Sequence, residues 1–513
     1  MHIQLSFSLL LASTALAGFD MGPVNRLRNG RLRLLPPKFN VSTAAGPTVT
    51  RRAEDFYRPQ FSNPKAASFH VNSSALPYID FPLQDSWAGR LPVSNKTGDD
   101  RVLCTLTRTG LLQQLFFWYW PSAQSTESDS FTIWLNGGPG CSSLAGFLQE
   151  NGPISFKPGA QAPTANQYAW TEASDVIWID QPVGTGFSVG TQDIQDENDL
   201  ADEFYGFLTQ FYSVFPELAK KKLYITGESY AVDVVGMYIP YIATRILQAS
   251  AAEQAALPLS LQGLLINDGV YSSFVVDQEA PVAQFAKTNQ QAIGLSDSEV
   301  ANLARLSASC GRMSPRYDDM LAQVTYPPKG KILLPGNSEA IPGDCEMWGD
   351  FAQDAYGSNP CFNVYRYTDE CPAPSDGSST YLSLTALQKA LHIPNSGVFS
   401  ECSDDLSPYS EGLMPDLLAK LPRGITLWHG LLDALLFNLG DRLTVQNLTW
   451  NGAQGFSAPP TTPLIVGGSQ RGVYRSERNL TYIEVDGAGH MIPGDQPETA
   501  LHVFQAVLGQ TAL

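Results

Sequence analysis

Short runs of apolar and aromatic residues recur along the chain and are separated by amphipathic or polar segments. These runs occupy residues 116–120, 131–135, 176–179, 223–225, 261–266, 424–428 and 482–485. Runs of this length without polar alternation are typical of strands that are buried on both faces of a sheet. Two of them, 131–135 and 176–179, end at loops rich in Gly and Pro, as strands that feed functional turns often do.

Segments with helical spacing lie between the predicted strands. Residues 199–215 place large apolar side chains on one helical face, namely Leu200, Phe204, Phe207, Leu208 and Phe211. Residues 384–391 and 499–508 also have the spacing of helices. Strands that alternate with helices predict an α/β fold with a mostly parallel central sheet and helices on both faces.

Composition divides the chain into three parts. Residues 1–17 hold an apolar run followed by small residues, which predicts a signal peptide. Residues 18–52 are expected to be poorly ordered and form a possible propeptide ending at Arg51 and Arg52, although an ordinary exposed loop fits this pair equally well. Residues 53–513 then form one large domain, in which a more polar stretch at about 271–375 is expected to be a cap insertion.

Charge, cysteines and sequons narrow the class of protein. The 513 residues carry a net charge of −18 without a basic cluster, so nucleic-acid binding is not expected. No second long apolar stretch is present, so no membrane anchor is expected. Seven cysteines favour an oxidising compartment, and glycosylation sequons favour the secretory route. The sequons are those of Asn40, Asn72, Asn95, Asn447 and Asn479.

Ser229 has the sequence context of a catalytic nucleophile. It lies in the string Gly-Glu-Ser-Tyr-Ala of residues 227–231, directly after the apolar run 223–225. A strand, a sharp turn that carries an exposed serine, and a helix form the pattern of a nucleophile elbow. The pattern predicts acyl-transfer chemistry, which needs a base for the serine and a carboxylate to orient that base.

His490 is the candidate for the base. It follows the predicted strand 482–485 in a Gly-Ala-Gly turn, which can present an imidazole at the rim of a sheet. Of the other histidines, His2 and His70 lie near the N-terminus, and His392, His429 and His502 lie in or beside apolar segments, where we expect them to pack.

Asp433 is the candidate for the orienting carboxylate. It follows the predicted strand 424–428 and lies between Ser229 and His490 in the chain, as the order Ser, Asp, His requires. A carboxylate among leucines is costly to bury without a partner, and a histidine N–H would provide one. The competing acid, Asp495, lies five residues after His490 and is expected to brace the His490 turn.

A glycine-rich loop follows the predicted strand 131–135. It reads Asn-Gly-Gly-Pro-Gly-Cys-Ser-Ser over residues 136–143. Backbone N–H groups exposed by such a loop can stabilise a developing oxyanion. Alone the loop is equally a structural turn, but beside the elbow and the His490 turn it favours acyl chemistry.

With these motifs the chain resembles the serine carboxypeptidase family of α/β-hydrolases. The matching segments are residues 86–92, 134–143, 180–188, 227–231 with 236–240, and 487–496. The resemblance implies an α/β-hydrolase fold in a secreted or vacuolar enzyme. Such an enzyme removes C-terminal residues from peptides and proteins through an acyl-enzyme, without a metal or organic cofactor.

The resemblance also implies residue roles. Ser229 would attack the scissile carbonyl, His490 would act as base and then acid, and Asp433 would orient His490. The backbone N–H groups of Gly138 and Tyr230 would form the oxyanion hole. The residues implied to bind the substrate's free carboxylate are Asn136, Gly137, Glu150 and Glu228, with Trp134 as support and Met491 and Tyr230 lining side-chain pockets.

The implied pairing of Glu150 with Glu228 has a physical consequence. Two close carboxylates resist ionising together, so at least one keeps its proton well above the ordinary pH range. The protonated carboxyl can donate a hydrogen bond to a substrate carboxylate, and ionisation would repel that group. Peptide affinity is therefore expected to fall above mildly acidic pH, with less effect on substrates that lack a free carboxylate.

The disulfide pattern is only partly indicated by the sequence. By resemblance Cys141 would pair with Cys402, and Cys104 is set aside because it lies in a stretch without a match in the family. Cys310 with Cys345 and Cys361 with Cys371 are working choices, because six cysteines allow fifteen pairings.

Two stretches depart from the family pattern, residues 102–114 and residues 232–235. Each is either a genuine insertion or a gene-model error, and transcript sequencing would separate these readings. Val232 and Asp233 would occupy positions beneath the nucleophile where small residues are expected, so a genuine insertion is expected to impair activity. The alternatives to a carboxypeptidase are an acyltransferase or lyase on the same fold, and an inactive binding homologue.

Overall fold

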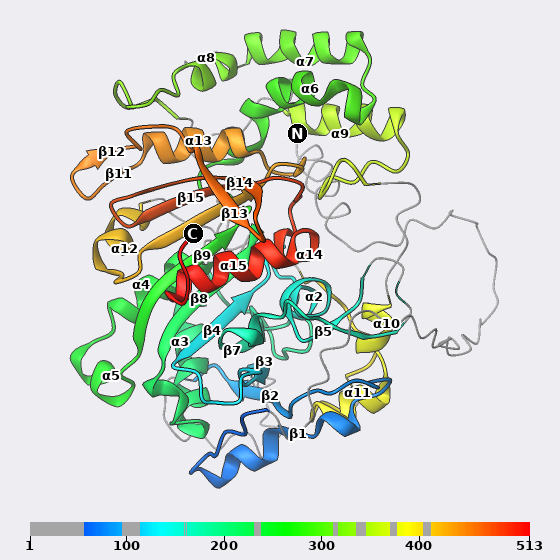
Figure 1. Cartoon of the computed structure of the whole chain (residues 1–513), viewed down its shortest axis with the longest axis vertical. Helices are drawn as coiled ribbons and strands as arrows, with labels where there is room; N and C mark the ends of the chain where they lie inside the picture. The colour runs from blue at the N-terminus through cyan, green and yellow to red at the C-terminus, as the bar shows by residue number, and fades with distance from the viewer. Residues whose placement is uncertain are drawn as a thin grey trace, which may run out of the picture.

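A computed structural model of the chain (Figure 1) describes residues 56–94, 113–157, 160, 162–229, 238–310, 316–334, 345–369, 377–394, 396–403 and 412–513. Several predictions lie outside these ranges. They concern the signal peptide 1–17, the possible propeptide 18–52, Asn40, Asn95, Cys104, Tyr230, residues 232–235 and Cys371.

The described residues form one large mixed β-sheet of eleven strands (Figure 1). The spatial order is β1-β2-β3-β7-β4-β8-β9-β10-β15-β14-β13. The strands are β1 (His70–Val71), β2 (Ser86–Pro92), β3 (Gln114–Trp120), β4 (Ser130–Leu135), β7 (Asp175–Asp180), β8 (Lys222–Glu228), β9 (Ser260–Asn267), β10 (Ile425–Gly430), β13 (Thr462–Val466), β14 (Ser469–Glu477) and β15 (Leu480–Val485). Short hairpins pair β5 (Ile154–Ser155) with β6 (Thr164–Ala165) and β11 (Thr449–Trp450) with β12 (Ala453–Gln454).

The centre of the sheet is parallel and both of its flanks are antiparallel. The strands from β7 through β4, β8, β9 and β10 to β15 pair in parallel. Antiparallel pairing adds β3, β2 and β1 on one side, and β14 and β13 on the other. Every residue of β4, β7 and β10 is buried, which explains why apolar residues predominate in them without alternation.

Each predicted strand coincides with an observed strand, and all but one lie wholly within it. The run 424–428 begins one residue too early, because Gly424 has a left-handed φ of 66° and precedes β10. The hairpin of β13 and β14 has no counterpart among the predicted elements. Strand β14 is polar and partly exposed, whereas β13 contains an apolar run at 464–466 that was not recognised as a strand; β1 and β2 were not predicted either.

The helices are α2 (Leu144–Gly146), α3 (Glu197–Val214), α4 (Tyr238–Leu247), α5 (Ala251–Ala256), α6 (Ala280–Ile293), α7 (Asp297–Ser309), α8 (Tyr317–Ala322), α9 (Met347–Ser358), α10 (Ser378–Leu382), α11 (Thr385–Ala390), α12 (Met414–Lys420), α13 (Asn438–Asn447), α14 (Ile492–Asp495) and α15 (Pro497–Leu508). Two π-helical turns, η5 (Phe147–Asn151) and η9 (Val275–Glu279), extend α2 and precede α6. The 3₁₀ turns are η2 (Pro64–Phe69), η3 (Ser73–Ala75), η6 (Trp170–Glu172) and η7 (Leu218–Lys220).

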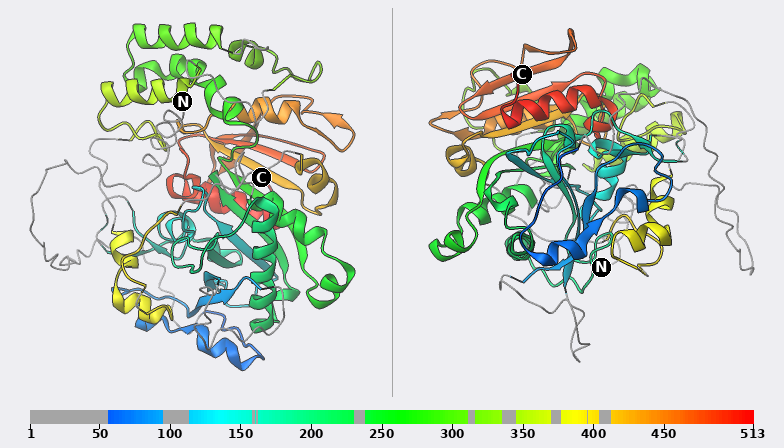
Figure 2. Two further views of the ribbon diagram at one scale, coloured as in Figure 1. Left: turned by 180° about the vertical axis from the view of Figure 1, so that it is seen from behind. Right: turned by 60° about the horizontal axis from the view of Figure 1, so that its bottom comes forward.

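Helices cover both faces of the sheet, as the sequence predicts for a sheet with a parallel centre. One core contains the apolar faces of α3, α4 and α12, and the core on the other face contains those of α2, η5, α11 and α15. Figure 1 shows α15 and α2 in front of the sheet, and the reversed view in Figure 2 brings the opposite face forward. Helix α3 begins at Asp196, whose side chain accepts hydrogen bonds from Asn198 N and Asp199 N.

Helices α6 to α9 form a separate group at one end of the molecule (Figure 1). They share a third apolar core with α13 and with residues of the loop after β10, including Ala434 and Phe437. This group lies within the stretch 271–375, for which a cap insertion is predicted. In the described ranges, no helix is long and apolar enough to span a bilayer.

Candidate active site

Polar residues gather where the central parallel strands end. Because β4, β8, β9, β10 and β15 run in parallel, their carboxyl ends lie at one edge of the sheet. Ligand sites of open α/β sheets lie at this edge. The residues at the ends of these strands supply the site.

Ser229 follows β8 directly, at the turn that the sequence predicts. It has a φ of 55°, a left-handed conformation that is uncommon for a residue with a side chain. Strain of this kind occurs at functional positions, where the surrounding structure enforces it. The side chain of Ser229 is half-buried, whereas β8 before it is buried from Leu223 to Glu228. The turn therefore lifts the hydroxyl out of the sheet.

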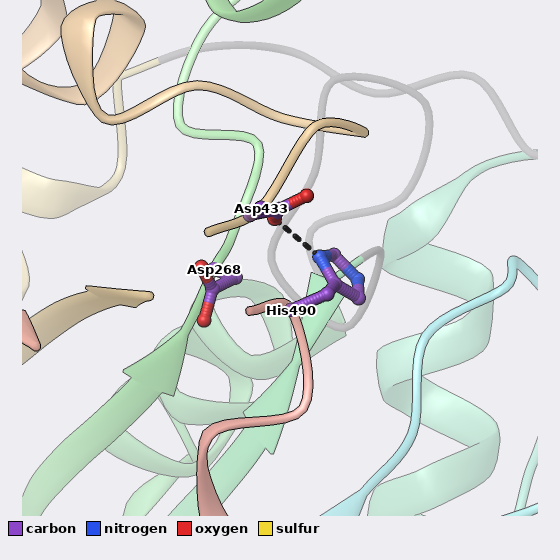
Figure 3. A group of neighbouring side chains, drawn as sticks. All are labelled: Asp268, Asp433 and His490. Carbon is purple, nitrogen blue, oxygen red and sulfur yellow. Dashed lines mark hydrogen bonds and ion pairs between the residues drawn. The ribbon is translucent and has the colours of Figure 1, made fainter. Parts of the chain in front are cut away.

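His490 and Asp433 lie in direct contact. Nδ1 of His490 is 2.6 Å from Oδ2 of Asp433, and both side chains are buried (Figure 3). The other oxygen of Asp433 accepts hydrogen bonds from Leu435 N at 2.7 Å and Leu436 N at 3.2 Å. Burial lowers the pKa of His490, but Asp433 raises it more, so the pKa lies above its ordinary value.

Asp495 has a different partner from Asp433. Its Oδ2 accepts a hydrogen bond from Gly489 N at 2.7 Å, and Arg366 Nη1 lies 3.5 Å from its other oxygen. Asp495 therefore braces the turn before His490, as the sequence analysis expects. The backbone N–H of His490 donates to Tyr365 O at 2.7 Å, and the Tyr365 ring lies 5.4 Å from the imidazole. The cap stretch thus holds the histidine from a second side.

The glycine-rich loop after β4 is closely packed at Gly138. Gly138 has a φ of 119°, and a Cβ there would lie 2.6 Å from Cys141 Sγ. A side chain is therefore excluded at this position. Gly137 O accepts a hydrogen bond from Cys141 N at 2.9 Å, which closes the loop.

Asn136 connects this loop to Glu228. Its Oδ1 accepts hydrogen bonds from Trp134 Nε1 at 2.7 Å and from Gly146 N at 3.2 Å. Its Nδ2 donates to Glu228 Oε1 at 2.7 Å. A Cβ on Gly146 would lie 2.4 Å from Trp134 Nε1, so α2 packs against this network without room for a side chain.

Glu150 and Glu228 form a buried acidic pair. Glu150 is only 4% exposed and Glu228 only 5% exposed. Glu150 lies in η5. Burial raises the pKa of Glu150 well above its ordinary value, and the negative charge of Glu228 raises it further. Burial also raises the pKa of Glu228, whereas His490 opposes that increase.

The hydrogen bonds indicate which member of the pair carries the proton. Both oxygens of Glu228 accept from amide groups, Oε1 from Asn136 and Oε2 from Asn267 Nδ2 at 3.3 Å. No amide N–H donates to the side chain of Glu150 within the described part of the chain, and its one side-chain hydrogen-bond neighbour there is Glu228. An oxygen that accepts an N–H has no need of a proton, so the shared proton is best placed on Glu150.

Two residues of the site were not predicted from the sequence: Asn267, the last residue of β9, and Asp268, which follows it. Asn267 Nδ2 donates to His490 O at 2.8 Å as well as to Glu228, so one amide links the elbow to the histidine turn. Asp268 has a φ of 40° and is fully buried. The signal was a polar Asn-Asp pair at the end of the predicted strand 261–266, a position that often carries function in parallel sheets.

Asp268, Asp433 and His490 are close enough to share an ion, and no other such group occurs within the described ranges. Their nitrogen and oxygen atoms lie within 4.8 Å of one another (Figure 3). An ion there would have to displace the 2.6 Å hydrogen bond of Asp433 to His490. We therefore interpret the group as acid–base machinery.

The remaining site residues have mixed outcomes. Met491 follows His490, is half-buried and precedes α14. Disulfides join Cys141 to Cys402 and Cys310 to Cys345, as expected. The pairing of Cys361 with Cys371 cannot be followed, because Cys371 lies outside the described residues.

Of the histidines expected to pack, His392 is exposed, with Nε2 2.9 Å from His70 O, whereas His429 is buried beside carboxylates.

Comparison with known proteins gives a consistent result. A profile described as serine carboxypeptidase matches residues 108–510. A carboxypeptidase Y homolog of Arthroderma benhamiae is 34% identical over 476 residues, covering 88% of this chain and 89% of its own. Serine-type carboxypeptidase F of Aspergillus niger is 30% identical over 501 residues, covering 88% of each chain.

A solved structure shows the same fold. The crystal structure of a prohormone-processing carboxypeptidase from Saccharomyces cerevisiae aligns with a TM-score of 0.64. The alignment covers 86% of this chain and 96% of that one, at 24% sequence identity. The sheet with its two helical layers is that of an α/β-hydrolase fold, as the sequence predicts.

Proposed function

The chain belongs to the serine carboxypeptidase family, and we propose that it releases C-terminal amino acids from peptides and proteins through an acyl-enzyme on Ser229. It is a serine-type carboxypeptidase with peptide substrates. We further propose the catalytic and binding roles of individual residues, a dependence of peptide hydrolysis on pH, and the cellular compartment of the protein. The observation that carries these roles is the buried Glu150–Glu228 pair directly beside the elbow serine.

The hydrolysis would proceed in two steps. His490 Nε2 takes the proton of Ser229 Oγ as the oxygen attacks the scissile carbonyl, while Asp433 holds the imidazole through Nδ1. Backbone N–H groups of Gly138 and Tyr230 stabilise the resulting oxyanion. His490 then gives its proton to the leaving amine, which departs as the free C-terminal amino acid. A water molecule, activated by His490, hydrolyses the acyl-enzyme in the same way.

The acidic pair would restrict this chemistry to chain ends. A peptide that places its last scissile bond at Ser229 brings its terminal carboxylate toward Asn136, Gly137, Glu150 and Glu228. The proton on Glu150 provides a hydrogen-bond donor for that carboxylate, and burial strengthens the bond. Peptides extended beyond this point would leave the buried carboxyl without its anionic partner.

The reaction class is tested with an N-blocked dipeptide in two forms, one with a free C-terminus and one amidated. We expect the free acid to be hydrolysed with the larger kcat/KM, because the amidated form cannot accept the same charge-assisted hydrogen bond. Binding without release of an amino acid would support an inactive binding homologue. Transfer of the acyl group to an added alcohol in preference to water would support an acyltransferase.

We expect peptide hydrolysis to fall as the pH rises through the raised pKa of the Glu150–Glu228 pair. Below that pKa Glu150 is protonated and donates a hydrogen bond, whereas above it both carboxylates repel the substrate carboxylate. Once the pair is fully ionised, kcat/KM for a peptide should drop by up to about tenfold per pH unit. The measurement is a pH profile of kcat/KM.

An N-blocked amino acid ester provides the control, because it has no free carboxylate and needs only the catalytic residues. Its alkaline limb should lie at higher pH than that of the peptide. In Glu150→Gln the side chain donates at every pH, so the peptide profile should approach the ester profile. Identical profiles for both substrates in the wild-type enzyme would refute this role of the pair.

We also propose that the chain enters the secretory route, to be secreted or delivered to a vacuole. The supporting observations are the predicted signal peptide 1–17, the sequons and the two disulfides. The possible propeptide 18–52 would be removed on this route. The domain 53–513 would carry the activity, with the stretch 271–375 as a cap that shapes side-chain preference.

Among the described sequons we expect Asn72 to carry a glycan and Asn447 to remain bare. Asn72 is exposed, and only its Oδ1 is engaged, by Ser74 N and Ser74 Oγ. Asn447 uses both ends of its amide, since Oδ1 accepts from Ile332 N at 2.8 Å and Nδ2 donates to Ile332 O at 3.0 Å. Glycopeptide mass spectrometry of the secreted protein checks this. A fully occupied Asn447 would contradict it.

A further inference from the structure

His429 lies between two buried carboxylates directly behind the catalytic pair. It is the fifth residue of β10 and is only 1% exposed. Its Nδ1 is 2.7 Å from Asp441 Oδ2, and its Nε2 is 3.4 Å from Asp268 Oδ1. Asp441 comes from α13, and Asp268 follows β9. Three elements therefore converge on one imidazole that the proposed mechanism does not use.

This arrangement favours the doubly protonated imidazole. Nδ1 is hydrogen-bonded to Asp441, and Nε2 lies at ion-pair distance from Asp268, so a positive charge on the ring is attracted from both sides, whereas a neutral ring gains only the hydrogen bond to Asp441. Burial lowers the pKa of His429, but Asp441 and then Asp268 outweigh burial and raise the pKa to about 10. The imidazole and Asp441 thus form a buried ion pair. Because both residues are buried, each charge is balanced by the other and not by water.

The pair is connected to the catalytic residues by short links. Asp268 Oδ1 accepts a hydrogen bond from Gly430 N at 2.8 Å, and Gly430 O accepts one from Asp433 N at 3.1 Å. Asp268 also lies within 4.8 Å of the polar atoms of Asp433 and His490 (Figure 3). A charge on His429 therefore acts across a few ångströms of buried protein, where electrostatic effects are weakly screened.

The surroundings of His429 are strongly acidic. Asp268 after β9, Asp433 after β10, Asp441 on α13 and Asp277 on η9 all face it. Burial raises the pKa of Asp268, Asp277 and Asp441, as expected for carboxyls that lack solvent. Glu484 on β15, near Asp441, has its own cation, since Arg442 Nε and Nη2 each lie 2.6 Å from it. His429 is therefore the cation that faces the other carboxylates.

We propose that His429 is a positioning residue for the reaction: a permanent buried cation that offsets the carboxylates behind the catalytic pair, so that His490 becomes a free base at lower pH. The proposal rests on the proposed function, since it concerns the role of His490 there. Without the cation, the neighbouring negative charges would hold the proton on His490 more tightly. If Glu150 and Glu228 bind the substrate carboxylate at acidic pH, the base His490 has to be neutral in that same pH range.

Two variants should move the acid limb of the ester pH profile in opposite directions. His429→Gln removes a positive charge and should shift the limb of kcat/KM upward by about half to one pH unit. Asp441→Asn removes a negative charge while Asp268 still faces His429, so the limb should shift downward. The ester lacks a free carboxylate, so the titration of Glu150 and Glu228 does not change its kcat/KM. A merely structural role would lower kcat/KM for both variants without opposite shifts.

The charge itself is measured by nitrogen NMR of wild-type protein with isotope-labelled histidine. One imidazole, assigned by its absence in His429→Gln, should stay doubly protonated at pH 8. If His429→Gln does not fold, Asp441→Asn gives the assignment instead, because the pKa of His429, the direct partner of Asp441, should fall by more than one unit and by more than that of any other histidine. An all-neutral set of imidazoles at pH 8, or limbs that move the same way or stay fixed, would overturn the proposal. The NMR result does not depend on turnover, so it stands apart from any failure of the proposed carboxypeptidase roles.

Discussion

Ser229→Ala is expected to lower kcat for a blocked dipeptide by about 10⁵-fold or more, because no acyl-enzyme can form without the hydroxyl. The residue sits at a left-handed turn at the end of β8, and alanine fits that backbone no worse than serine does. The fold and substrate binding should therefore remain. Stopped-flow measurement should show no burst of the first product.

An exposed serine on α7, Ser298, provides the matched control for the same substitution. Ser298→Ala should retain wild-type kcat and KM, since it lies on the outer surface of the helical group α6 to α9. Retention of more than a hundredth of the activity in Ser229→Ala, with contaminating wild-type enzyme excluded, would show that another group is the nucleophile.

Asp433→Asn is expected to lower kcat by about 10⁴-fold with little change in KM. The carboxylate accepts the Nδ1 proton of His490, which leaves Nε2 free to act as a base. An amide can present its NH₂ group to Nδ1 instead, and the imidazole then adopts the wrong tautomer. The hydrogen bonds from Leu435 N and Leu436 N can still reach the amide oxygen, so the loop should keep its shape.

Asp495→Asn tests whether any acid near His490 would produce that loss. Asp495 accepts from Gly489 N at 2.7 Å and does not contact the imidazole through a hydrogen bond in the described structure. Its amide can accept the same backbone bond, so kcat should fall by less than about tenfold. Equal losses in the two variants would remove the distinction between the orienting acid and the bracing acid.

The parts of the fold that were predictable are those with local signals. The buried parallel strands have apolar sequences because both faces are covered, and each predicted run falls on an observed strand. Ser229, Asp433 and His490 are marked by strand-turn contexts that can be recognised within ten residues. In the edge hairpin, β14 was missed because its polar, partly exposed sequence has no such pattern.

The parts that were not predictable arise from contacts between distant segments. Asn267 matters because β9 lies between β8 and β10, and strand order cannot be derived from one sequence. His429 was expected only to pack, because it lies beside an apolar segment. Its charge follows from Asp268 and Asp441, which reach it from another strand and from a helix.

The shared amide of Asn267 has a consequence for anyone who wishes to redesign this enzyme. Glu228 is joined through Asn267 to the backbone of His490, whereas Glu150 makes no such bond in the described structure. A substitution of Glu228 that removes the preference for peptides with a free C-terminus would therefore also disturb His490, the catalytic base. A mutant library aimed at converting the enzyme to an amidase should therefore vary Glu150. There the recognition of the substrate's C-terminus can change without loss of the catalytic residues.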